Sequence, residues 1–75
     1  MAVLPPLRPR EVVKGLEKFG WTVARQRGSH IILTKPGHIT SLSVPDHEQV
    51  ARGTLWSLLN KAGIRVEDFL EALGR

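Results

Sequence analysis

The chain has 75 residues, a formal charge of +4 and no cysteine. This length suits one small domain, which must be stabilised by packing because disulfides and thiolate metal sites are excluded. Cysteine-free composition favours a reducing, cytoplasmic location. Val3-Leu4 runs into Pro5-Pro6 without a preceding basic cluster, which is unlike an export signal, and the apolar runs are too short to span a membrane. We expect a single domain over residues 1–75.

The positive charge is concentrated in the first half of the chain. Residues 1–35 hold seven Lys or Arg against two acids, a balance of +5, whereas residues 36–75 have a balance of −1. A basic face of this kind can bind a polyanion such as nucleic acid. On charge alone, a solvated surface that keeps a small protein dispersed is an equal explanation.

The first elements in chain order are an arm and a helix. Residues 1–7 lack periodicity and contain two prolines, which predicts a loose N-terminal arm. Pro9 suits the first position of a helix, and Gly20 suits its end. The apolar positions predict one buried helix face, made by Val12, Val13, Leu16 and Phe19. The same helix should turn a basic row to solvent, made by Arg10, Lys14 and Lys18.

Three short strands should follow the helix. They are predicted over residues 21–26, 31–35 and 39–44, and the second connection contains the turn Pro36-Gly37. In the third run, Leu42 and Val44 should face one way and the serines between them the other. The buried face of the first two strands stays open, because two apolar sets alternate there: Trp21, Val23 and Ile32, or Ala24, Ile31 and Leu33.

Two helices should complete the fold. The first begins at about residues 53–54 with Thr54 as candidate N-cap, and its stripe consists of Leu55, Leu58, Leu59 and Ala62. The second covers about residues 66–73. Trp56 lies off the stripe, yet core is the safer expectation for it, with a partner contact as the alternative. Together these elements predict an α+β domain of order α-β-β-β-α(-α), with helices packed on one face of a three-stranded antiparallel sheet.

The connection between the first two strands carries the most chemistry. Gly28-Ser29 suits a two-residue hairpin turn whose first central residue has φ > 0. Arg27 and His30 then become direct cross-strand partners, and alternation places Arg25 on the same face. Three groups that can bind or protonate a phosphate would converge there. Lys35, Ser29 and His47 are further candidates for phosphate contacts.

The other catalytic patterns that we considered have little support. The histidines at 30, 38 and 47 have no helical i, i+4 spacing and no cysteine near them, so we expect no zinc site and no other metal or cofactor. Ser29 adjoins His30, but neighbouring strand residues point to opposite faces, and no G-x-S-x-G elbow is present. His30 could act as acid or base on RNA, with cations stabilising the phosphorane. A lone strand-end histidine without a partner is the structural alternative.

Several motifs together resemble the HicA (YcfA-like) toxin family. They are Leu16 to Trp21, Arg25 to His30 with its G-S-H element, the V-P-x-H element from Val44 to His47, Gly53-Thr54-Leu55 and Ala62-Gly63-Ile64. The resemblance implies a fold similar to a double-stranded-RNA-binding domain and an mRNA-cleaving activity with His30 as the catalytic residue. It also implies a HicB antitoxin partner that covers the active face.

Two alternatives to the toxin endoribonuclease stay open. A non-catalytic RNA-binding module would use the same fold to recognise RNA by shape and phosphate contacts. A helix-turn-helix DNA binder would use residues 55–73, but its second helix carries Glu67, Asp68 and Glu71, which would repel DNA. We therefore expect that helix pair to pack on the sheet. Neither alternative requires a membrane or a small-molecule cofactor.

Overall fold

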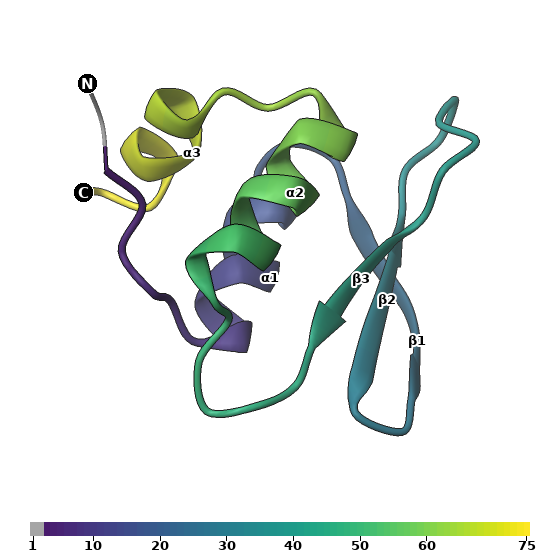
Figure 1. Ribbon diagram of the computed structural model, residues 1–75. Coiled ribbons are helices and arrows are strands. Elements are labelled where there is room, and N and C mark those ends of the chain that lie inside the picture. Colours follow the sequence, from purple (N-terminus) through teal and green to yellow (C-terminus); the bar gives the residue numbers. More distant parts are fainter. Residues whose placement is uncertain (1–2) are drawn as a thin grey trace.

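The computed structural model describes residues 3–75 and places three helices beside one open sheet (Figure 1). In chain order the elements are α1 (Pro9–Glu17), β1 (Thr22–Arg27), β2 (His30–Thr34), β3 (Leu42–Pro45), α2 (Arg52–Ala62) and α3 (Val66–Ala72). The strands are antiparallel in the order β1-β2-β3. Helices α1 and α2 lie on one side of the sheet, so its other face is open (Figure 1). The α+β class and the α-β-β-β-α-α order are confirmed.

The core forms between the helices and the inner face of the sheet. Val12 and Leu16 of α1 are fully buried, and the sheet contributes Leu33, Leu42 and Val44. Helix α2 adds Leu55, Leu58 and Leu59, as its predicted stripe requires. The predicted basic row of α1 lies in solvent, since Arg10, Lys14 and Lys18 are all exposed.

The segment before α1 is not a loose arm over residues 3–7. Leu4 and Leu7 are buried in the core, and the Val50 N–H donates a 2.7 Å hydrogen bond to the Leu7 carbonyl. The segment is not helical, so its buried positions follow no helical periodicity. It is held in place by the burial of these two leucines. Met1 and Ala2, the rest of the predicted arm, lie outside the described residues.

Helix α2 differs from the prediction at two positions. It begins at Arg52 after Ala51, so Thr54 lies inside the helix and is not the N-cap. Trp56 is 57% exposed and is therefore not a core residue. A residue one position after Leu55 lies about 100° around the helix, which turns Trp56 away from the stripe that meets the sheet.

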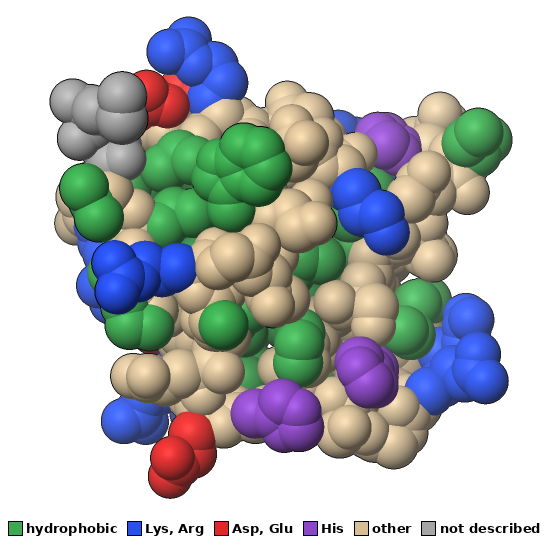
Figure 2. Space-filling view, in the orientation of Figure 1, with side chains coloured by type: hydrophobic (Ala, Val, Ile, Leu, Met, Phe, Trp, Pro, Cys, Tyr) green, Lys and Arg blue, Asp and Glu red, His purple; other side chains and the backbone are tan. Residues whose placement is uncertain are grey.

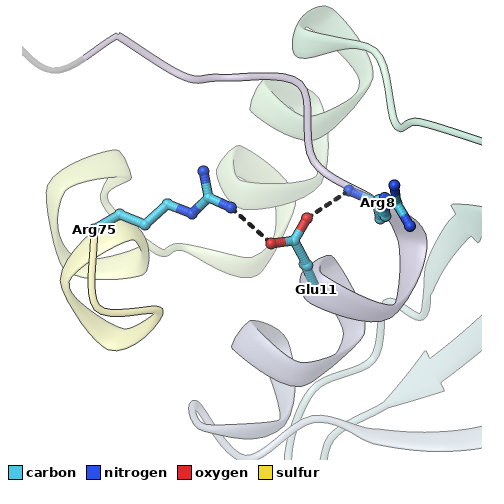
Figure 3. A network of polar contacts seen from close by, with 3 residues as sticks. All are labelled: Arg8, Glu11 and Arg75. Atoms are coloured by element: carbon cyan, nitrogen blue, oxygen red, sulfur yellow. Dashed lines mark hydrogen bonds and ion pairs between the residues drawn. The ribbon is translucent and has the colours of Figure 1, made fainter.

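Helix α3 packs against α1, where we had expected it to pack on the sheet. Phe69 is fully buried, and its ring lies against Gly15 of α1. Two polar contacts involve residues just past the ends of these helices. Lys18 Nζ, after α1, donates to the Ala72 carbonyl at 2.8 Å, and Arg75, after α3, pairs with Glu11 at 2.7 Å. Figure 3 shows the Glu11 carboxylate between Arg75 and the backbone N–H of Arg8. The acids of α3, Glu67, Asp68 and Glu71, remain exposed.

Candidate nucleic-acid interface

The β1–β2 hairpin has the predicted turn. Gly28 has φ +56, a conformation that glycine adopts without steric cost, and Ser29 completes the two-residue connection. The register pairs Arg27 directly with His30. Both side chains are exposed, so the cation and the imidazole are neighbours on one accessible face of the sheet.

A β-bulge at Ala24 determines which side chains share this face. Val23 pairs with Leu33 and Arg25 pairs with Ile32, which leaves Ala24 as an extra residue between them. The extra residue reverses the alternation of side chains along β1. Val23 therefore belongs with the buried Leu33 on the helix side, while Arg25 joins Arg27 on the open side. Neither of the two alternating apolar sets in the sequence is buried as a whole.

A hollow of about 560 Å³ opens beside His30 on the open face. Its walls are Arg27, Gly28, His30, Ile32 and Ser43. Ser43 pairs with Ile32 across β2 and β3, so a hydroxyl and a half-buried apolar side chain lie next to the imidazole. Neither residue was predicted to be part of the site, although Ile32 belongs to one of the two alternating apolar sets. The alternation of strand side chains could have indicated both residues. Ile32 is two residues from His30 and so shares its face, and Ser43 lies between Leu42 and Val44 and so faces away from the core.

The loop after β3 is attached to the hairpin turn. Pro45 is the cross-strand partner of His30, and the Asp46 N–H donates a 2.7 Å hydrogen bond to the Ser29 carbonyl. The Asp46 carboxylate accepts a 2.9 Å hydrogen bond from Gln26 Nε2. Gln26 pairs with Ile31, which is on the helix side, so this carboxylate lies on the far side of the sheet from His30.

Three of the further candidate residues occupy different places. Ser29 is in the turn and His47 is in the loop next to Asp46, and both are exposed. Lys35 follows the other end of β2, where its aliphatic chain lies near Gly20. Five strand residues span about 17 Å, so Lys35 is separate from the group at the turn.

The electrostatics of the visible surface favour an anion near the hairpin. Figure 2 shows Lys and Arg side chains at the right-hand edge, over the sheet, with histidine side chains on the neighbouring surface. The acidic side chains visible in this view lie towards the left, one at the upper edge and one at the lower edge near a histidine. Exposed cations attract phosphate groups, and the carboxylate bonded to the hairpin, that of Asp46, contacts Gln26 on the helix side.

Two further properties concern the described part of the chain only. Within residues 3–75, no three His, Cys, Asp or Glu side chains are grouped so that they could hold a metal ion. None of the helices found in that range has the length and apolar character needed to cross a membrane.

Comparison with known families gives one clear result. A family model described as "HicA toxin of bacterial toxin-antitoxin" matches residues 9–64, from the first residue of α1 to just past α2. The match includes the hairpin, the hollow and the loop after β3, whereas α3 lies beyond it. A search of curated proteins found no match to the chain. Because the matched region covers about three quarters of the sequence, the chain belongs to the HicA toxin family of bacterial toxin–antitoxin systems.

Proposed function

We propose that this toxin is a metal-independent endoribonuclease that cleaves mRNA at the open face of the sheet, with His30 as general acid or base. The observation that carries the proposal is the pairing of Arg27 with His30 on an exposed face, in a chain of a toxin family. A strand-end imidazole without cations beside it would have no comparable reason to bind phosphate.

The chemistry that this arrangement could perform uses the nucleophile that RNA already carries. The ribose 2′-OH attacks the adjacent phosphorus once its proton is removed, and the bond to the 5′ oxygen of the next nucleotide breaks. A proton carrier near the phosphate accelerates such a transfer by about 10² to 10⁴. Arg25 and Arg27 would stabilise the charge of the phosphorane by direct electrostatic contact.

The remaining candidate residues are proposed to bind the RNA strand. Arg25, Arg27, Ser29 and His47 lie at or beside the hairpin turn and would contact phosphates around the scissile bond. Lys35, at the other end of β2, would contact the strand several nucleotides away. These contacts position the substrate and carry little sequence preference.

Membership of a toxin–antitoxin family implies an antitoxin partner. We propose that this partner is a HicB-like protein and that it covers the open face of the sheet. The exposed cations of that face, Arg25 and Arg27, would then attract acidic groups of the antitoxin, and RNA and antitoxin would exclude each other. Addition of a purified cognate antitoxin should abolish RNA retardation by the toxin.

The decisive experiment compares the wild type with His30→Ala on single-stranded RNA in EDTA, with fragment lengths and retardation measured on one gel. We expect cleavage by the wild type and loss of cleavage with retained binding for the variant. Equal cleavage by both proteins would refute the role of His30. Retardation without cleavage by either protein would instead establish a non-catalytic RNA-binding module.

His38→Ala is the matched control for this comparison. It removes another exposed histidine, located on the β2–β3 connection, where its ring lies 4.9 Å from that of Trp21. We expect it to cleave at the wild-type rate. A contaminating nuclease would be revealed by activity in a mock preparation from cells without the toxin, purified in parallel.

A further inference from the structure

Metal-free cleavage of RNA through the 2′-OH requires two proton transfers. One group removes the proton of the 2′-OH, and another donates a proton to the departing 5′ oxygen. A single imidazole cannot be the base and the acid in the same displacement, so the proposed function leaves one proton carrier unassigned. The inference below rests on that proposed function.

The backbone contacts bring His47 close to His30. Antiparallel pairing places Pro45 opposite His30, and the hydrogen bond from the Asp46 N–H to the Ser29 carbonyl continues this pairing into the turn. Each histidine is therefore one residue away from this 2.7 Å contact. Two histidines that are 17 positions apart in the sequence are brought to one end of the sheet.

The two neighbours of His47 line a groove that His47 does not line. Asp46 and Glu48 both line a groove on the helix side, together with Val13 and Ile31. The Asp46 carboxylate is fixed there by its hydrogen bond from Gln26. The chain bends at residues 47–49, and His47 does not line the groove. Its side chain is exposed, and its backbone adjoins the turn that leads into His30.

The loop that carries His47 is held at both ends. Its first residue, Asp46, is bonded to Ser29, and its last part is bonded through the Val50 N–H to the Leu7 carbonyl at 2.7 Å. Val50 itself is buried. A loop fixed in this manner keeps the backbone of His47 near one position, and a proton carrier needs such placement.

We infer that His30 and His47 form the acid–base pair of the reaction. One neutral imidazole takes the 2′-OH proton as the 2′ oxygen bonds to phosphorus. The other, as imidazolium, protonates the 5′ oxygen as the P–O bond breaks. The products are a 2′,3′-cyclic phosphate and a free 5′-OH, and the two imidazoles have exchanged protonation states. The carboxylates beside His47 are turned to the helix side and take no part.

The first test is the rate of cleavage by His47→Ala at saturating RNA in EDTA. Loss of a proton carrier should lower kcat by about 100-fold or more, whereas loss of the phosphate contact proposed for His47 should weaken RNA retardation by no more than about tenfold. A variant that cleaves at the wild-type kcat overturns the inference. So does a variant whose only defect is a raised KM, because that result makes His47 a binding residue.

The second test uses RNA with a sulfur in place of the 5′ bridging oxygen at one linkage. A thiolate leaves without a proton, so loss of the acid no longer matters on this substrate while loss of the base still does. We expect one of the two variants, His30→Ala or His47→Ala, to recover to within about tenfold of the wild type and the other to stay inactive. Recovery of both or of neither overturns the pairing.

These outcomes separate failure of the inference from failure of the proposed function. If wild-type protein does not cleave RNA at all, or if His30→Ala cleaves normally, the proposed function fails and the pair fails with it. If the wild type cleaves and His30→Ala does not, while His47→Ala keeps its kcat, only the pair is refuted. His38→Ala serves as the control in every assay.

Discussion

The ring of Phe69 occupies the space that a side chain at Gly15 would need. A Cβ atom at Gly15 would lie 2.5 Å from Cε1 and 2.7 Å from Cζ of that ring, which is closer than carbon atoms pack. Helix α3 therefore reaches α1 only because residue 15 is glycine. This contact lies between the matched family region and a helix outside it.

Gly15→Ala should destabilise the protein by about 1–3 kcal/mol, the usual effect of overpacking a tight contact. In an exposed helix interior the same change would stabilise by up to about 1 kcal/mol. Urea denaturation measures the difference. In a Phe69→Ala background the clash is absent, so the added methyl group should become neutral or favourable. Additive effects of the two substitutions would contradict this account.

Gly28→Ala should lower the free energy of unfolding by about 1–2 kcal/mol, because residue 28 has φ +56. A Cβ at this position would meet no neighbouring atom. The cost is therefore conformational, and Gly28→Asn should be milder, since asparagine tolerates this region. Gly53→Ala is the control, because Gly53 is in α2, has no positive φ and has open space around it. It should stabilise slightly. Equal effects of alanine at positions 28 and 53 in urea denaturation would refute the argument.

Stability should depend on Glu11 at acid pH. The backbone hydrogen bond from Arg8 and, after it, the side-chain contact with Arg75 lower the pKa of Glu11 below its ordinary value of 4.5. A lowered carboxyl pKa contributes stability above the unfolded-state value, and this contribution is lost as pH falls through the folded-state value. The free energy of unfolding of the wild type should therefore fall below about pH 4.5.

Glu11→Gln tests this contribution by urea denaturation between pH 2 and 7. Its unfolding free energy should be lower than that of the wild type at pH 7 and should converge with it at the acid end. Glu17→Gln, which changes an exposed carboxylate of the same helix, should run parallel to the wild type over the whole range. A constant difference between wild type and Glu11→Gln would exclude the proposed cause.

The cations of the open face should determine the salt dependence of RNA binding. Arg25→Gln and Arg27→Gln should each reduce the slope of log K against log salt by about 0.7, which is the contribution of one phosphate contact on a single strand. Lys61→Gln, on the exposed side of α2, is the matched loss of one charge elsewhere. Retardation gels at several salt concentrations give the three slopes. An equal reduction by all three variants would indicate a general charge effect.

Local sequence signals predicted the parts of the fold that depend on neighbouring residues. The periodicity of Val12 and Leu16 predicted the buried face of α1, and Gly28-Ser29 predicted the hairpin and the pairing of Arg27 with His30. Two of the positions that failed, Leu4 and Leu7, depend on distant contacts. Leu4 and Leu7 are buried by tertiary packing without any periodicity of their own.

The sequence predicted the part of the candidate site that lies within the β1–β2 hairpin. The faces of β1 could not be assigned, because a bulge adds one residue without a compositional mark, and Ala24 is an ordinary strand residue by its side chain. Ile32 and Ser43 joined the site only through the β2–β3 register. The connection between these strands is seven residues long. A connection of this length does not determine which residues of β2 and β3 pair, whereas a two-residue turn does.

Because of the bulge at Ala24, the side chains on the open face of the sheet depend on the number of residues in β1 as well as on their identity. Upstream of the bulge, Val23 faces the helix side of the sheet and remains 44% exposed. Downstream, Arg25 and Arg27 face the open side. An unbulged strand of the same composition would place Val23, Arg25 and Arg27 on a single face, so that either Val23 would leave the helix side or the two guanidinium groups would be turned towards it. Related chains that lack one residue here should therefore carry their cations at shifted positions.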